Sequence, residues 1–338
     1  MLLKIGSKFA TAVIASAMLL CACSSWTAAF EKKNEAEASS SQKESSGIIT
    51  GVSSSKPTAS RTETIKASSS SKPQVIEPQV TLSTEAPIVG DAMAIFVENA
   101  DDISVVTSLG FTPRFFAQGN RQIALLPISY TIAPGDYTLD VKADGKPFHF
   151  NIKVTDRDFE EQYLTVDETV TKNTAGNAEA NNQWTQLIEP LKLISDPQQY
   201  WEGNFISPIS GEIKDKISTE YGSIRYTNGS QVASRHSGID IAVKAGTPVL
   251  ATGNGRVQFS GFLTLTGNTV VIEHGYGLKS LYYHMESLNV KEGDMVKQGQ
   301  QIGAVGSTGF STGPHCHFSM AVNNVFTNPW FMIEKGIG

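Results

Sequence analysis

The sequence predicts a mainly β protein, with a small immunoglobulin-like β-sandwich followed by a larger all-β domain. Short segments of partly alternating apolar and polar residues, separated by turn residues, run from residue 86 to 156. From residue 201 onward the sequence is rich in glycine and in short β-runs. Between them, residues 178–194 have the spacing of a half-buried helix. These three observations predict two β parts joined by a helical connector.

Length and composition agree with several folded domains. The chain has 338 residues, of which 40% are hydrophobic and 9% aromatic, which is enough to build cores. The formal net charge of −6 argues against a nucleic-acid partner, because such proteins usually carry a basic patch. We therefore expect no nucleic acid among the partners.

The N-terminus is typical of an export signal. Lys4 and Lys8 precede the apolar residues 9–20, a stretch shorter than the roughly 20 residues that span a membrane. It ends in Leu-Cys-Ala-Cys, which resembles a bacterial lipobox whose last residue, Cys23, is lipidated. We expect residues 1–22 to be a lipoprotein signal peptide and Cys23 to bind membrane lipid. An ordinary signal peptide with incidental cysteines is the alternative, and both place the rest of the chain outside the cytoplasm.

Four segments are expected after the signal peptide. Residues 23–85 are rich in Ser, Lys and Thr and have few large apolar residues, so we predict a disordered tether. Residues 86–165 are expected to form the β-sandwich, in which no residue carries chemistry. Residues 166–202 are the predicted connector, where Trp184, Leu187 and Ile188 form an apolar stripe and Pro190 kinks or ends the helix. The last β domain is expected to span residues 203–338.

Five of the six histidines lie in this last domain, and two groups have the spacing of metal ligands. His236 and Asp240 are four residues apart. His315 and His317 are two apart, so on a strand both imidazoles point into one groove, whereas Cys316 between them points into the interior as a packed thiol. A tripod of two His and one Asp around Zn²⁺ leaves a fourth position for water, which is typical of a catalytic site.

Several further motifs accompany these residues in a fixed order. Between residues 205 and 329 the chain carries Asn228-Gly229, His236-x-x-x-Asp240, Gly246-Thr247-Pro248-Val249, Gly267-Asn268-Thr269-Val270, Tyr282-x-His284 and Gly313-Pro314-His315-x-His317-Phe318. This series resembles the LytM-type, lysostaphin-like zinc peptidases of peptidase family M23. The resemblance implies a barrel-sandwich-like endopeptidase domain that acts on the peptide part of peptidoglycan.

The resemblance also implies a role for each site residue. His236, Asp240 and His317 would bind one Zn²⁺ per chain, and His284 and His315 would serve catalysis. The sequence leaves open which of these two histidines is the general base. Together with the lipobox, the resemblance predicts a monomeric hydrolase, anchored by lipid to a bacterial membrane and facing the cell wall.

Further side chains near the motifs carry weaker expectations. Tyr282 is expected to point the same way as His284 and to line the substrate groove, and Asn228 is a second candidate for substrate binding. His274 is expected to be an exposed turn residue. Ser319, where many relatives have Glu, should share the face of His317 and act behind the metal ligands.

Alternatives remain at this stage. A non-catalytic LytM-like regulator, which binds the wall or activates an amidase, would be expected to lack one or more ligands. Residues 290–300 also resemble the turn of biotinyl and lipoyl carrier domains, although the modified Lys between two Met residues is missing. The bond cut can lie in a glycine cross-bridge or in a D-Ala-to-diamino-acid cross-link, and we favour the second. The long tether favours a single-membrane cell over a two-membrane one.

Overall fold

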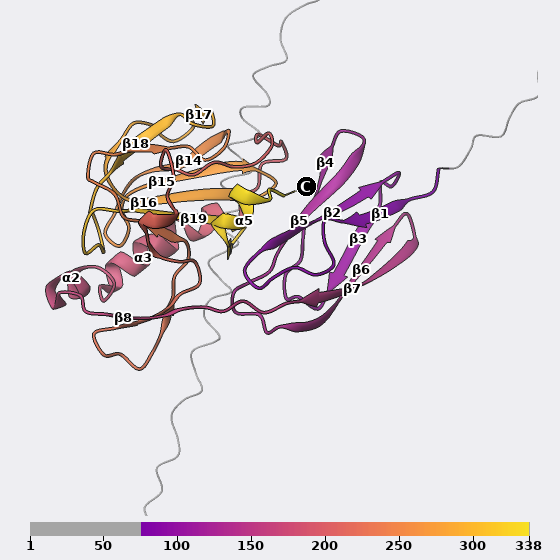
Figure 1. Cartoon of the computed structure of the whole chain (residues 1–338). Helices are drawn as coiled ribbons and strands as arrows, with labels where there is room; N and C mark the ends of the chain where they lie inside the picture. The colour runs from indigo at the N-terminus through magenta and orange to yellow at the C-terminus, as the bar shows by residue number, and fades with distance from the viewer. Residues whose placement is uncertain (1–75, 338) are drawn as a thin grey trace, which may run out of the picture. The chain divides into compact units, whose positions relative to one another are not determined.

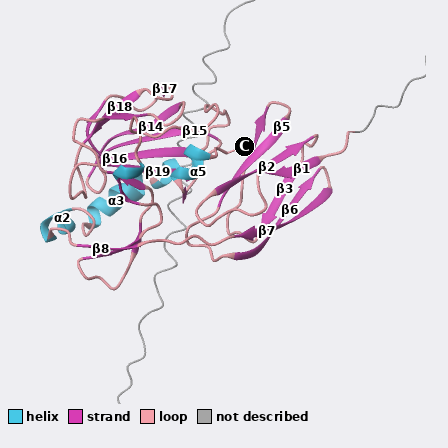
Figure 2. Cartoon of the chain, in the orientation of Figure 1, coloured by secondary structure: helices cyan, strands magenta, loops and turns pink. Residues whose placement is uncertain are grey.

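Figure 1 shows the computed structural model of the chain, which describes residues 76–337. Strands predominate in both folded parts (Figure 2), so the predicted mainly β class is confirmed. The predicted signal peptide, Cys23 and residues 24–75 of the tether lie outside the described residues. Within the described part, no helix combines the length and the apolar character that a membrane crossing requires.

Two antiparallel sheets form the N-terminal β part. One sheet has the strand order β1-β2-β5-β4 and the other the order β3-β6-β7. Their bounds are β1 (Gln79–Leu82), β2 (Ala92–Glu98), β3 (Ile103–Thr107), β4 (Phe115–Gln118), β5 (Arg121–Pro127), β6 (Gly135–Ala143) and β7 (Lys146–Val154). Alternate residues of both sheets, such as Ile95 and Val141, share one apolar core. An immunoglobulin-like topology for this part stays a prediction.

The predicted disordered tether, residues 23–85, extends too far toward the C-terminus. Residues 79–82 form β1, which pairs with β2 over four residues. The alternating Val80 and Leu82 are only partly buried and pack on the core of the sandwich. Such a short strand carries too little apolar surface to stand out beside the Ser-rich stretch that precedes it.

One strand and three short helices lie between the two β parts, the strand ending just before the predicted connector and the helices within it. Their bounds are β8 (Glu161–Leu164), α2 (Glu168–Asn173), α3 (Ala178–Leu187) and α4 (Glu189–Leu193). Pro190 lies in the first turn of α4, where its missing N–H costs no hydrogen bond, so the predicted helix is divided at Ile188 as expected of a proline. Ile188 is buried and Trp184 half-buried, whereas Leu187 is exposed, so the predicted stripe is narrower than expected.

The C-terminal β part is built on a ten-stranded antiparallel sheet. Its main path is β17-β14-β15-β16-β19-β12-β9, with β13, β18 and β20 paired at its sides, and a three-stranded sheet β11-β10-β8 lies apart from it. The bounds are η1 (Lys214–Lys216), β9 (Ile217–Thr219), β10 (Ile224–Thr227), β11 (Ser234–Arg235), β12 (Ile239–Ile241), β13 (Pro248–Leu250), β14 (Gly255–Leu263), β15 (Gly267–Gly275), β16 (Leu278–Leu288), β17 (Met295–Val296), β18 (Gln301–Val305), β19 (Cys316–Val322), β20 (Val325–Thr327) and α5 (Pro329–Glu334).

The register of three central strands aligns residues of interest in one row. In the β12–β19 ladder Asp240 lies opposite His317, and in the β16–β19 ladder Tyr283 lies opposite the same histidine. Gly238, just before β12, lies so close to β19 that an added Cβ would meet the Phe318 carbonyl oxygen. A side chain at that position would therefore push β12, and with it Asp240, away from β19.

His274 is buried, contrary to the expectation of an exposed turn. It lies on β15 with none of its surface exposed. Its Nδ1 donates to the Asn254 carbonyl oxygen at 2.7 Å, and Nε2 lies 2.8 Å from the Ser280 hydroxyl. Burial lowers the pKa of His274 to about 4, so the ring is neutral near pH 7. Strand β15 continues through residue 275, one residue beyond this histidine, and so keeps it inside the fold.

A fully buried ion pair joins the connector to the sheet. Lys279 and Glu273 contact each other with neither side chain exposed. Lys279 Nζ also donates to the Ile194 carbonyl oxygen at 2.6 Å, and Glu273 Oε1 accepts from the backbone N–H of Asp196 and Gly277. Burial raises the pKa of Glu273 and lowers the pKa of Lys279. The attraction between the two opposite charges opposes both shifts.

We expect Lys279→Met to destabilise the chain by about 3–5 kcal/mol, because it leaves the Glu273 carboxylate buried without its counter-charge. Urea denaturation followed by tryptophan fluorescence measures the loss. The double variant Glu273→Gln/Lys279→Met should recover part of it, and Lys291→Met, at an exposed lysine, serves as control. A loss at Lys279 no larger than that of the control would contradict the assigned role of the pair.

Candidate metal centre

Three donor side chains converge between β12 and β19. His236, Asp240 and His317 are 3%, 6% and 5% exposed, and their ligand atoms all lie within 4.8 Å of one another. Asp240 Oδ1 is 3.0 Å from His236 Nε2 and 2.8 Å from His317 Nδ1, and the two ring nitrogens are 3.0 Å apart. Donors on a tetrahedral Zn²⁺ are about 3.3 Å apart, since each bond is about 2.0–2.2 Å long. The group therefore has the size of a tripod for one small cation.

The hydrogen bonds behind the two histidines fix which nitrogen faces the centre. His236 Nδ1 lies 2.9 Å from the Glu220 carbonyl oxygen, which can only accept, so Nδ1 carries the proton and Nε2 is a free lone pair. His317 Nε2 lies 2.8 Å from the Ser319 hydroxyl, which leaves Nδ1 toward the centre. Two lone pairs and a carboxylate oxygen then face one another, an arrangement that a cation between them stabilises.

Charge and burial act together on this group. Burial opposes the ionisation of Asp240, but the neighbouring His236 and His317 outweigh it and hold the pKa of this carboxyl well below its usual range. Burial also lowers the pKa of His317 to about 4. A neutral imidazole and an ionised carboxylate are the forms in which these side chains bind metal.

Two further histidines, His284 and His315, border the tripod and line the same groove. His284 Nδ1 donates to the Thr308 carbonyl oxygen at 2.8 Å, and His315 Nδ1 donates to the Gly313 carbonyl oxygen at 2.9 Å. Both Nε2 atoms are thereby left as acceptors, and His315 Nε2 is 3.7 Å from Asp240 Oδ1. The two rings are 4.7 Å apart. Burial and the neighbouring histidines lower the pKa of His284 to about 3, so its ring is neutral near pH 7.

The backbone at His284 is unusual and explains its position. His284 has φ of 62°, in the left-handed region that a non-glycine residue rarely adopts. The turn of the chain interrupts the alternation of β16, so that both Tyr283 and His284 line the groove. The Tyr283 ring lies flat on His317, with ring centroids 4.6 Å apart and 4° between the planes. Tyr283 thus fixes the orientation of the His317 ring from the neighbouring strand β16.

The segment that carries these residues is similar to known peptidases. The family model of peptidase family M23 matches residues 234–329, which include the tripod and both bordering histidines. This part of the chain is a peptidase M23 domain. The M23 domain is 37% identical over 114 residues to the peptidoglycan DD-endopeptidase ShyC of Vibrio cholerae. The aligned segment covers 34% of this chain and 26% of that protein.

Two other relatives bear on activity and on fold. The DD-carboxypeptidase/endopeptidase Mpg of Neisseria meningitidis is 45% identical over 94 residues, or 28% of this chain and 22% of that protein. The matched segments span about a quarter of these two curated relatives. A crystal structure from Pseudomonas aeruginosa, assigned to peptidase M23, covers 73% of this chain and 94% of its own with a TM-score of 0.54. At 23% identity that likeness establishes the fold.

The groove of the M23 domain has a volume of about 700 Å³. The tripod, the two bordering histidines and residues 310–314 line it. Its lining also includes Gln162, Leu164, Thr165 and Val166, from β8 and the residues that follow it. Residues that precede the matched segment by some seventy positions therefore complete the site.

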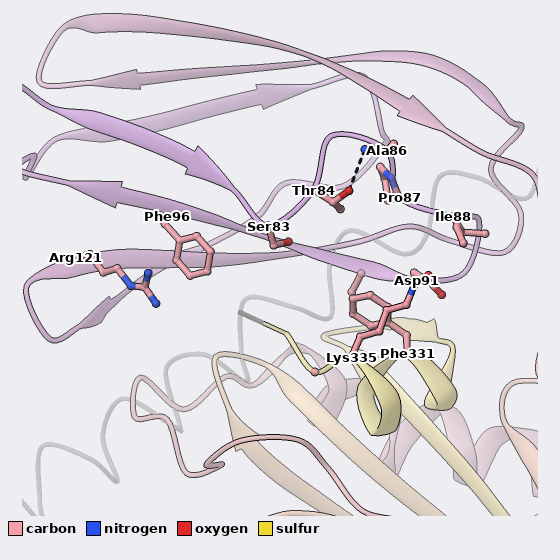
Figure 3. A pocket seen from close by; sticks show the side chains of 12 residues that line it. Ser83, Thr84, Ala86, Pro87, Ile88, Asp91, Phe96, Arg121, Phe331 and Lys335 are labelled. Carbon is pink, nitrogen blue, oxygen red and sulfur yellow. Dashed lines mark hydrogen bonds between the residues drawn. The ribbon is translucent and has the colours of Figure 1, made fainter.

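Cavity volume alone does not identify the site. A second cavity, of about 600 Å³, is lined by eight residues between Ser83 and Phe96, by Arg121 and by Phe331, Lys335 and Gly336 near the C-terminal end (Figure 3). Among the described residues it shares no lining residue with the groove. Its polar side chains do not converge on one point, whereas the donors of the tripod do, and we therefore place the chemistry in the groove.

The two expected substrate contacts do not lie where the sequence placed them. Tyr282 is fully buried, its hydroxyl accepts from the Thr252 N–H at 2.9 Å, and its ring packs near Phe318. The expectation that Tyr282 lines the groove with His284 is wrong. The positive φ of His284 interrupts the strand alternation, so His284 points to the same side as Tyr283 and not to the side of Tyr282. Asn228 lies outside the groove lining, and its Oδ1 accepts from the Val166 N–H at 2.8 Å. That bond ties the loop after β10 to the connector.

Two other expectations about orientation are confirmed. Cys316 is fully buried in the core, and of the described residues it is the only cysteine, with a free thiol whose pKa burial raises. Ser319 lies on the same face as His317 and contacts its Nε2. The strand alternation of β19 predicts both positions.

One charged side chain adjoins the tripod. Arg225 lies on β10, and its Nη2 donates to Asp240 Oδ2 at 2.5 Å. The carboxylate is thus held at one oxygen by a guanidinium and presents the other to the tripod. A charge-assisted bond of this kind orients a metal ligand.

Proposed function

We propose that the chain is a zinc-dependent endopeptidase that cleaves peptide cross-links of peptidoglycan during cell-wall remodelling. The observation that carries the proposal is the convergence of three buried donors and two acceptor nitrogens in one groove. His236, Asp240 and His317 would hold one Zn²⁺, and the presence of all three favours an enzyme over a regulator that lacks ligands.

The residues divide the work as follows. Zn²⁺ held by the tripod would supply Lewis acidity, which lowers the pKa of water and polarises a scissile carbonyl. His284 and His315, each fixed through Nδ1 by a backbone carbonyl, can accept the proton of the attacking water at Nε2 and return it to the leaving amine. The histidine that accepts this proton becomes a cation, and its positive charge stabilises the oxyanion that develops on the scissile carbonyl.

The curated relatives favour the cross-link between D-Ala and a diamino acid over a glycine bridge. Both ShyC and Mpg are named for DD-peptide activity. Incubating purified muropeptide dimers with the full chain and reading the products by mass spectrometry tests this. We expect D-Ala cross-linked dimers to become monomers, and a chain that leaves these dimers intact but cuts glycine bridges would contradict the assigned bond.

We also propose that the protein acts as a monomer outside the cytoplasm and is anchored by lipid at Cys23. Action on peptidoglycan requires an extracytoplasmic location, and the Leu-Cys-Ala-Cys sequence supplies an anchoring site. Stable anchoring takes two or more acyl chains, which lipobox modification would provide.

Cys23→Ala is expected to move the protein from the membrane fraction to a soluble or uncleaved form. Fractionation and metabolic labelling with a fatty acid measure the change, and Cys21→Ala is the matched control, since it alters the neighbouring cysteine of the same segment. Retained lipid labelling in Cys23→Ala, together with its loss in Cys21→Ala, would place the anchor two residues earlier.

A further inference from the structure

Gln162 lies outside the M23 domain in sequence but beside its metal centre in space. It belongs to β8, which leaves the N-terminal sandwich and pairs in parallel with β10, and it lies directly opposite Arg225 in that ladder. The two residues are 63 positions apart. The expected peptidase domain, residues 203–338, does not contain this strand.

Both ends of the Gln162 amide are engaged. Its Oε1 accepts from Arg225 Nε at 3.2 Å, while its Nε2 donates to the Thr219 hydroxyl at 3.3 Å and to the Ser218 carbonyl oxygen at 3.4 Å. The amide is therefore fixed on β9 at one end and holds the guanidinium at the other. An amide suits this position because it offers a donor and an acceptor at once.

Arg225 carries the constraint to the proposed metal ligand. Its Nη2 donates to Asp240 Oδ2, and the pair is largely buried, with side-chain exposures of 20% and 9%. With Oδ2 held, the carboxylate cannot turn about its last bond without breaking this contact. Its Oδ1 then stays directed at His236 Nε2 and His317 Nδ1.

We infer that Gln162 is a positioning residue for Asp240, acting through Arg225, and that the strand before the M23 domain is part of its metal centre. The inference rests on the proposed metal site but not on the bond that is cut. Partners behind metal ligands typically change metal affinity by about 10–100-fold when removed. The affinity of the full chain for Zn²⁺ is therefore the quantity that tests it.

The experiment compares three variants with the wild-type full chain by competition for Zn²⁺ with a chromophoric chelator. Gln162→Met, which keeps the length but removes the amide, is expected to weaken Zn²⁺ binding about 10-fold or more. Gln162→Glu, which keeps an acceptor for Arg225 Nε, should stay much closer to wild type. Gln231→Leu, at an exposed glutamine outside the groove lining, should leave the affinity unchanged.

Two further measurements separate positioning from general damage. The absorption spectrum of the Co²⁺-loaded chain should change in Gln162→Met, since the ligand geometry is less defined, and thermal melting of the metal-free variants should match wild type. Zn²⁺ affinity within about twofold of wild type in Gln162→Met would overturn the inference. Equal weakening in Gln162→Met and Gln162→Glu, with lowered melting of both, would also overturn it in favour of a packing role.

The same data distinguish this inference from the proposed function. A wild-type chain that binds Zn²⁺ but cleaves no muropeptide would refute the endopeptidase proposal, while the affinity comparison would still decide the role of Gln162. A wild-type chain that binds no Zn²⁺ would overturn both.

Discussion

Asp240→Ala is expected to reduce bound Zn²⁺ from about one per chain to near zero and to abolish hydrolysis. The substitution removes the one anionic donor of the tripod and leaves two neutral imidazoles, and it also leaves Arg225 buried beside the site without its partner. A guanidinium freed in this way repels a cation. His236→Ala and His317→Ala should lose the metal as well, because two protein donors hold Zn²⁺ weakly.

Elemental analysis of the purified variants measures the metal, and muropeptide digestion measures the activity. Chelation of the wild type should give the same loss, and added Zn²⁺ should restore activity to the wild type but not to the variants. His149→Ala is a matched control, since His149 contacts Asp140 at 2.6 Å on an exposed strand of the sandwich. Full metal content in Asp240→Ala would remove this carboxylate from the ligand set.

Local periodicity explains which parts of the site were predictable. The inward position of Cys316 follows from strand alternation, because on β19 Cys316 and Phe318 lie in the core whereas His317 and Ser319 share the other face. The same rule failed on β16, where it placed Tyr282 on the groove. The positive φ of His284 reverses the facing there, and nothing in the residue types around a histidine predicts such a backbone conformation.

Contacts between distant segments explain what could not be predicted. The sequence of the M23 domain indicates the tripod because its members lie in recognisable motifs. Gln162 and Arg225 meet only because β8 pairs in parallel with β10, and parallel pairing of two four-residue strands leaves no periodic signal that links them. The strand β1 could not be predicted for a related reason. Its four residues form a strand because they pair with β2, and their own composition does not indicate that pairing.

The site also shows why domain bounds drawn from family motifs can omit working parts. Gln162 and residues 164–166 line the groove, and the Val166 N–H donates to Asn228 in the loop after β10. A peptidase fragment that starts after this segment would lose this part of the lining and the contact between Gln162 and Arg225. Apart from the tether, which β1 shortens, the expected bounds of the segments stay predictions, and the full chain is the appropriate material for activity measurements.

His284→Ala and His315→Ala are each expected to keep Zn²⁺ and to lower the rate of hydrolysis by about 10²–10⁴-fold. Neither residue belongs to the tripod, so three protein donors remain in both variants. Each loss removes one nitrogen that can accept or donate a proton at the reacting atoms. Because the two rings lie 4.7 Å apart and face the same centre, the double variant should lose less than the product of the two single losses.

The measurement combines metal content, circular dichroism and the initial rate of muropeptide cleavage. Zinc near one per chain, an unchanged fold and a lost rate would support the separation of binding from catalysis. Release of the metal by His315→Ala would instead make His315 a ligand. His315→Ala is the more informative of the two variants, because His315 Nε2 lies only 3.7 Å from Asp240 Oδ1. A variant with near-normal turnover would show that its histidine has a structural role only, and the other histidine would then have to carry both proton transfers.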